Sequence, residues 1–134
     1  MSTAEFETVD AAVSLKLAED LFEAIADNDA DRLRNEVYDP EVVVWHNNDN
    51  HEQRIDENIK VLGWLHHKIG SKRYEEVRRQ PTPTGFVEQH VLRGTAPDGT
   101  ELNVSACLVV RVLNGRIVRI DEYLDSSAIS AIAR

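Results

Sequence analysis

The chain has 134 residues, the length of one ordinary domain, and 42% of them are hydrophobic, too many for a disordered chain. We therefore expect one domain over residues 1–134. Its net charge of −9 would repel a phosphate backbone, which argues against a nucleic acid partner. No segment approaches the roughly 20 apolar residues that span a membrane, and residues 1–7 lack a signal-peptide pattern. The single cysteine, Cys107, excludes an internal disulfide, so we expect a cytoplasmic protein without membrane contact.

The first part of the chain is predicted to be helical. Apolar residues recur at intervals of three and four from Val9 to Asp27, which is the spacing of one amphipathic helix. Asp29 is a suitable N-cap for a short second helix through Arg34. Asp39-Pro40 then ends that helix, because proline disfavours a helical conformation in the residue before it.

Strands are predicted for most of the remaining chain. The β-branched and aromatic run at 41–47 indicates a strand, and a third helix is predicted from the capping residues near Asn48 to Ile69. Pro97-Asp-Gly99 and Asn114-Gly115 are hairpin signals between further strands, which cover residues 73–79, 86–96, 101–113 and 116–124. Helices followed by mostly antiparallel strands predict an α+β fold with the helices on one face of the sheet.

Alternation along the last two strands shows which side chains share a face. One face of 101–113 is wholly apolar and should meet the helices; it carries Val104, Ala106, Leu108, Val110 and Val112. On the final strand, Glu122 shares a face with Val118, Ile120 and Leu124. A carboxylate on such a face must be paired, protonated or beside a cavity. Glu122 is thus either a general acid or base, or a residue at the edge of the core that binds a backbone group or an arginine.

Alternation does not decide which face of the sheet carries the histidines of two other strands. Strands 41–47 and 86–96 could turn either face inward. His46, His90 and Cys107 share a parity and could bind a transition metal, although interface histidines and a buried thiol are commoner. His66, near the apolar stripe of the third helix, is either a titrating group at a pocket mouth or a histidine at the helix end that favours the helix dipole.

Three segments together resemble the nuclear transport factor 2-like superfamily, which includes SnoaL-like polyketide cyclases, ketosteroid isomerases and limonene epoxide hydrolases. They are the closing strand at 115–125, the run Asn28-Asp29-Ala-Asp-Arg-Leu after the first helix, and Asp39-Pro-Glu-Val-Val-Val-Trp45. The resemblance covers residues 13–125. It implies a cone-shaped, curved, mostly antiparallel sheet around a pocket, with three helices of the N-terminal half on its concave face.

The active-site pattern of these enzymes is only partly present. Compared with limonene epoxide hydrolases, Asn47 and Glu122 match, Trp45 takes the place of a tyrosine, and Gln89 and Val91 replace the arginine and aspartate of the charge relay. The two oxyanion donors of ketosteroid isomerases are also missing, since their positions fall around Leu21-Phe22 and on Leu108. Neither of those two mechanisms is expected here.

The resemblance implies a site and an outer face. Glu122 would transfer a proton, while Asn47 and Gln89 would orient substrate or water. The pocket walls would include His66 at the mouth and a further set, namely Trp45, Val91, Arg93, Val104, Leu108, Ile120 and Leu124. His46, His90 and Cys107 would lie on the opposite face and pair two copies into a homodimer.

Such a pocket is typical of an enzyme that needs no cofactor or metal. We expect acid–base catalysis of an isomerisation, cyclisation, dehydration or hydrolysis of a small hydrophobic molecule. The alternative is a non-catalytic ligand-binding or dimerisation module of the same fold, which the missing relay residues favour.

Overall fold

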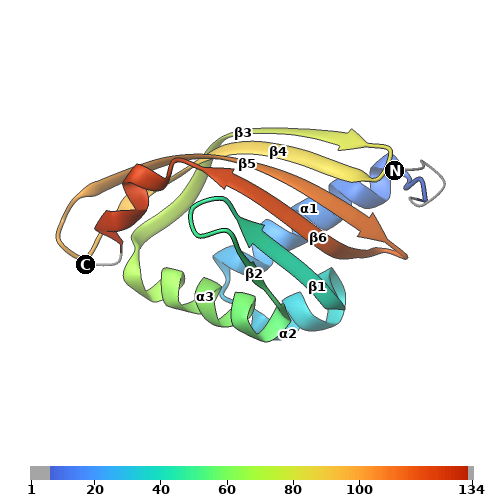
Figure 1. Ribbon diagram of the computed structural model, residues 1–134, viewed down its shortest axis with the longest axis horizontal. Helices are drawn as coiled ribbons and strands as arrows, with labels where there is room; N and C mark the ends of the chain where they lie inside the picture. The colour runs from blue at the N-terminus through green and yellow to red at the C-terminus, as the bar shows by residue number, and fades with distance from the viewer. Residues whose placement is uncertain (1–6, 133–134) are drawn as a thin grey trace.

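The computed structural model describes residues 7–132 and shows an α+β fold (Figure 1). One curved, unclosed sheet has the strand order β2-β1-β6-β5-β4-β3, and its pairs are antiparallel except β1 with β6. The strands are β1 Tyr38–His46, β2 His51–Gln53, β3 Gly70–Thr82, β4 Gly85–Thr95, β5 Glu101–Leu113 and β6 Arg116–Leu124. The helical elements are α1 Ala11–Ala26, α2 Ala30–Arg32, the π-helical turn η2 Leu33–Val37, α3 Ile55–Lys68 and the 3-10 helix η3 Ser126–Ala131.

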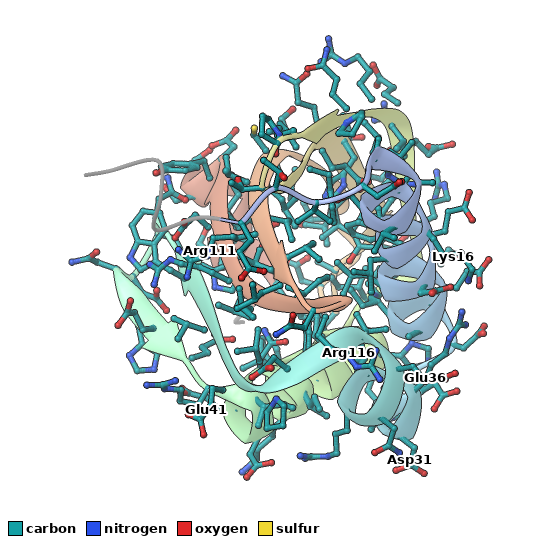
Figure 2. All side chains as sticks on the ribbon, turned by 90° about the vertical axis from the view of Figure 1, so that its right-hand side faces the viewer. Lys16, Asp31, Glu36, Glu41, Arg111 and Arg116 are labelled. Carbon is teal, nitrogen blue, oxygen red and sulfur yellow. The ribbon has the colours of Figure 1, made fainter. Side chains whose placement is uncertain are left out.

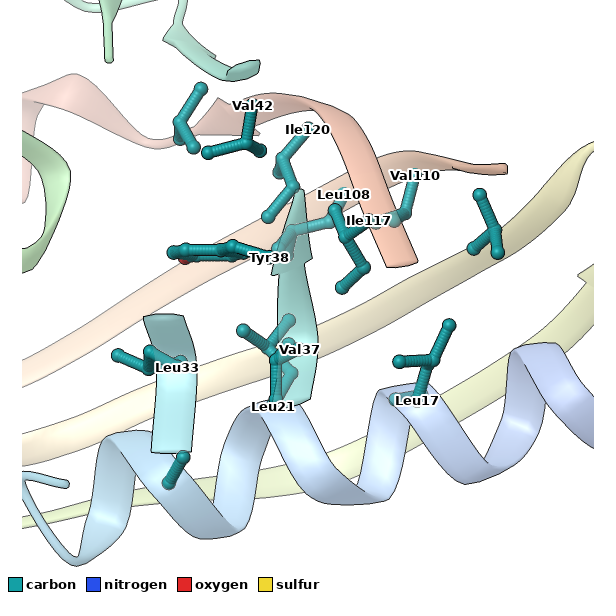
Figure 3. Packing of buried hydrophobic residues seen from close by; sticks show 14 of the residues in the cluster. Leu17, Leu21, Leu33, Val37, Tyr38, Val42, Leu108, Val110, Ile117 and Ile120 are labelled. Carbon is teal, nitrogen blue, oxygen red and sulfur yellow. The ribbon is translucent and has the colours of Figure 1, made fainter. Parts of the chain in front are cut away.

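The helices lie under the concave face of the sheet and bury their apolar sides against it (Figure 3). Leu17 and Leu21 of α1 belong to the same buried cluster as Val110 and Ile117 of the sheet. Tyr38 lies between these layers and is only 2% exposed. Charged side chains such as Lys16 and Glu36 point outward (Figure 2). The apolar face predicted for β5 is confirmed as the inner face, since its residues alternate with exposed ones.

The start of the third helix and the segment after β6 differ from the prediction for identifiable reasons. The third helix begins at Ile55, because residues near Asn48 form a turn between β1 and β2. Asn50 adopts a left-handed conformation with φ 53° there, and its side-chain oxygen accepts a hydrogen bond from Trp45 Nε1 at 2.8 Å. Asparagines suit such turns as well as helix caps, so the sequence alone did not distinguish them. After β6, Asp125 caps η3, which was not predicted.

Burial decides which faces of β1 and β4 point inward. Val42 and Val44 are buried on β1, so Trp45 lies on the opposite, outer face with the other odd-numbered side chains. On β4 the fully buried side chains are Phe86 and Glu88, with His90 4% exposed. The inner face of β4 is therefore the one that carries Glu88 and His90.

None of the described helices is both long enough and apolar enough to cross a membrane. Residues 1–6, most of the segment for which no signal-peptide pattern was found, lie outside the described residues.

Gly85 begins β4 where the hairpin crosses β5 closely. A Cβ added at this position would lie 2.0 Å from the backbone oxygen of Val110. Gly85→Ala should therefore lower the free energy of unfolding by about 1–3 kcal/mol or more in urea melts. Gly63→Ala in helix α3 is the matched control, because the atom nearest to the added Cβ is Asn28 Oδ1, at 3.7 Å. This change should raise the free energy of unfolding by about 0.5–1 kcal/mol. An equal effect of the two changes would contradict the close packing at Gly85.

Candidate functional site

Two adjoining cavities, of about 300 and 50 Å³, lie under the concave face and share six lining residues. We call them together the concave cavity. The shared residues are His46, Asn58, Leu62, Tyr74, His90 and Glu122. The larger part extends along Trp64, Leu65, Leu92, Val104 and Leu124 to η3. The cavity therefore has mainly apolar walls with a small set of polar side chains, which is the usual composition of a small-molecule site.

His46 and Glu122 form an ion pair in the wall of this cavity. Their strands are parallel neighbours, and the two residues lie opposite each other in the register. His46 Nε2 lies 2.9 Å from Glu122 Oε1, and the side chains are 17% and 20% exposed. Burial by itself lowers the pKa of His46, but the hydrogen bond and charge of Glu122, with the charge of Asp49, raise it overall. His46 thus holds its proton more firmly than an ordinary histidine does.

A chain of hydrogen bonds orients Asn58 from α3. The hydroxyl of Tyr38 donates to Asn58 Oδ1 at 2.7 Å, and Asn58 Nδ2 donates to Gln53 Oε1 at 3.0 Å. Burial raises the pKa of Tyr38, so its hydroxyl keeps its proton as a donor at neutral pH. Burial also raises the pKa of Tyr74, whose hydroxyl remains protonated where this residue lines the cavity.

A second carboxylate–histidine pair lies on β4. Glu88 is completely buried, and its Oε2 lies 2.6 Å from His90 Nδ1. Its other oxygen, Oε1, accepts a hydrogen bond from Arg79 Nε of β3 at 2.5 Å. The His90 ring packs against the rings of Tyr74 and Phe22, at centroid distances of 4.6 and 5.4 Å.

The structure brings together five of the residues expected in the site. Glu122, Leu108 and Ile120 line the smaller part of the cavity, and Glu122, Val104 and Leu124 line the larger part. These are the positions on β5 and β6, where a wholly or largely apolar face identified the inner side.

The placement expected for the residues of β1 was wrong. Trp45 packs edge-on against Tyr123 on the outer face, with ring centroids 5.2 Å apart. Asn47 is exposed and joins β1 to β6, because its side-chain oxygen accepts from the backbone N–H of Leu124 at 3.0 Å. Neither side chain lines the concave cavity.

The placement expected on β4 and α3 was wrong as well. Gln89 and Val91 line an open groove of about 360 Å³ on the outer face, next to Cys107. Arg93 forms ion pairs with Glu75 and Glu76 instead of approaching Glu122. His66 packs against His67 and is absent from the cavity lining. The comparison with epoxide hydrolases thus selected outward-facing residues of β1 and β4, each one position along the strand from a residue that faces the cavity.

The reverse error concerns the two histidines, which were expected on the outer face and lie at the cavity. The alternation contained a usable signal, because His90 shares its parity with Phe86 and Leu92, the two largest apolar residues of β4. His46 similarly shares its parity with Val42 and Val44. Cys107 pairs with Gln89 on the outer face and is absent from the concave cavity. No group of three or more side chains that could hold a metal ion occurs within residues 7–132.

No protein-family model matches this sequence, and no curated protein matches it. Solved structures do share its fold. An NTF2-like protein from Burkholderia xenovorans has a TM-score of 0.78 at 13% identity, over 93% of this chain and 98% of that one. A protein assigned as a SnoaL-like polyketide cyclase from Jannaschia has a TM-score of 0.74 at 17% identity, over 91% of this chain and 92% of that one. An LEH-like epoxide hydrolase from Mycobacterium tuberculosis has a TM-score of 0.70 at 13% identity, over 92% of each chain. The protein therefore has the NTF2-like fold.

The raised pKa of His46 makes its contribution to stability depend on pH. This contribution is complete below the unfolded-state pKa of about 6.5 and is lost as the pH rises through the higher folded-state pKa. The difference in unfolding free energy between the wild type and His46→Gln should thus shrink above about pH 6.5 in urea melts. His51, whose pKa is also raised by Glu57, is present in both proteins and cancels. A difference that grows with pH would contradict the pairing.

Proposed function

We propose that this protein is a cofactor-independent acid–base enzyme that acts on a small, mainly hydrophobic molecule in the concave cavity. Isomerisation, cyclisation, dehydration and hydrolysis are the reactions that such a site can serve. The His46–Glu122 pair carries the proposal, because it places an exchangeable proton in the wall of an otherwise largely apolar cavity.

The pair can pass a proton to a bound molecule without any change in oxidation state. In its acid form Glu122 carries the transferable proton on Oε2, while the Nε2–H of His46 donates to Oε1 across the 2.9 Å contact. When Oε2 gives its proton to the substrate, this N–H stabilises the carboxylate that remains. Tyr74 and Asn58 offer hydrogen bonds to a substrate oxygen. A developing negative charge would be stabilised by these donors in a site from which most water is excluded.

The size and lining of the cavity support a small neutral ligand. A volume of about 300 Å³ is at the lower end of the range of about 300–1,000 Å³ for small-molecule sites. Leu62, Leu65 and Val104 supply apolar contacts, and no lysine or arginine is among the lining residues. The polyketide cyclase and epoxide hydrolase assignments of proteins with the same fold agree with this substrate class by analogy.

The proton-transfer role is tested with a small enolisable ketone, 2-tetralone, whose α-protons exchange for deuterium in D₂O. The wild type should accelerate this exchange, and Glu122→Gln should lose about 100-fold or more, since the amide keeps the shape but cannot transfer the proton. Glu52→Gln is the control, because Glu52 pairs with Arg119 on the surface. NMR signals of the ketone give the rate directly.

The same experiment separates catalysis from simple binding. Trp64 lines the cavity, so a bound ketone should change its fluorescence. Binding without accelerated exchange would contradict the enzyme proposal and favour a ligand-binding module.

We also propose that the protein works as a cytoplasmic homodimer. The single cysteine and acidic composition support the location. The outer face of the sheet supports the pairing, because Val109, Leu113 and Tyr123 are 46%, 38% and 50% exposed there. Charges on this face, such as Arg119 with Glu52 and Asp121, are already paired within the chain. A second copy could therefore cover the part of this face formed by β5 and β6 in an isologous contact without burying these charges unpaired.

Val109→Lys should shift the dimer to a monomer in analytical ultracentrifugation at micromolar concentration. Val13→Lys, an exposed valine on α1 at 41% exposure, should leave the dimer intact. A monomeric wild type would refute the homodimer.

A further inference from the structure

We propose that His90, oriented by Glu88 and Arg79, is the base that works together with the His46–Glu122 pair. This role rests on the proposed acid–base function and adds to it the group that removes a proton from the substrate. It assigns a second catalytic residue from a strand on which the sequence comparison pointed to the opposite face.

The position of the proton on His90 follows from its neighbours. Arg79 can only donate hydrogen bonds, and it occupies Oε1 of Glu88. Oε2 of Glu88 is therefore the oxygen that accepts from His90 Nδ1 at 2.6 Å. Neutral imidazole carries a single N–H, so a proton on Nδ1 leaves Nε2 with a free lone pair.

Nε2 is the ring nitrogen available to a bound molecule. His90 lines both parts of the concave cavity, and its Nε2 has no hydrogen-bond partner among residues 7–132. Tyr74 and Phe22 contact the ring and prevent it from turning. The result is a fixed base whose acquired positive charge would be stabilised by the carboxylate of Glu88.

The two carboxylate–histidine pairs lie two strands apart on the same curved face. Glu122 is on β6, across Leu108 from Glu88, and His90 is on β4, across Ala106 from Leu124. Their backbones are therefore two strand spacings apart and staggered by two residues, a separation of about 12 Å. The residue opposite His90 on the intervening β5 is Ala106, whose small side chain leaves space between the two pairs. Both Glu122 and His90 line that space.

The two pairs differ in the proton that each can exchange. The His46–Glu122 pair holds a mobile proton, whereas His90 has a free lone pair on Nε2 that can accept one. In a carbonyl substrate, Nε2 would take a proton from the carbon next to the carbonyl group, and the C–H electron pair would form the enol double bond. Glu122 would give a proton to the carbonyl oxygen. The substrate neither gains nor loses electrons. Return of the enol hydroxyl proton to Glu122 and of the Nε2 proton to a different carbon would regenerate the carbonyl, complete an isomerisation and restore both pairs.

A stabilising role alone does not account for this arrangement. A buried ion pair is often no more stable than apolar residues of similar volume, because both groups lose their hydration. Glu88 is completely buried and His90 is 4% exposed, in a core whose other buried side chains are mostly apolar. The ionisable groups near His90 lie on both sides of its ring. Glu88, bound to Arg79, is on one side, and Glu122, His46 and Asp49 line the cavity on the other. Lys72 of β3 lies over the Tyr74 ring that packs against His90.

The tautomer of His90 is measured by long-range ¹H–¹⁵N correlation NMR, which distinguishes protonated from unprotonated ring nitrogens. The wild type should show a proton on Nδ1 and none on Nε2 when His90 is neutral. Glu88→Gln should reverse this, because Arg79 retains the amide oxygen and the amide N–H then donates to Nδ1. A wild-type proton on Nε2 would overturn the proposal without any measurement of activity.

Deuterium exchange of 2-tetralone tests the catalytic consequence. Glu88→Gln and His90→Gln should each lower the saturated rate by about 100-fold or more, while the half-saturating ketone concentration changes less than about threefold. Glu75→Gln is the matched control, since it removes a carboxylate paired with Arg93 outside the cavity. Urea melts establish that each variant is folded, and if Glu88→Gln is not, His90→Gln and the wild-type tautomer decide.

The outcomes separate the two proposals. Wild-type exchange that survives in folded His90→Gln but is lost in Glu122→Gln would overturn the role of His90 and retain the proposed function. An absence of exchange in the wild type would remove both.

Discussion

The parallel pairing of β1 with β6 is the constraint on which the site depends. It joins the N-terminal half of the chain to the closing strand and sets His46 opposite Glu122 in the register. The other strand pairs are antiparallel and follow from short connections. A shift of one residue in the parallel register would turn one of the two side chains to the outer face and separate the pair. The proton-transfer geometry is therefore a property of the sheet.

The curvature of the sheet gathers polar groups that are far apart in sequence. Tyr38, Asn58 and Gln53 form one buried hydrogen-bonded chain, and Arg79, Glu88 and His90 form another. The apolar cluster below them supplies most of the favourable burial. Each polar side chain of the two networks has at least one hydrogen-bond partner, which limits the cost of burying it. Orientation is what they provide, because each fixes a side chain that lines the same cavity.

The sequence predicted the architecture well and the site only in part. Strong alternation on β5 and β6 identified Val104, Leu108, Ile120 and Leu124 as inner residues beside Glu122. On β4, Phe86, Glu88, His90 and Leu92 compete with a face of Val87, Gln89, Val91 and Arg93, and only the larger apolar side chains of Phe86 and Leu92 favour the first face. The deciding factor is tertiary: Glu88 is buried because Arg79 and His90 satisfy its charge, and a sequence without contacts does not reveal that compensation.

The central claim is that a substrate oxygen lies beside Glu122 in the concave cavity. A crystal structure with 2-naphthol, an enol-like analogue of 2-tetralone, tests it most directly. The naphthol rings should lie between Leu62 and Val104, with the hydroxyl oxygen at hydrogen-bond distance from Glu122. Naphthol bound only in the outer groove beside Gln89 and Cys107, with the concave cavity closed, would contradict it.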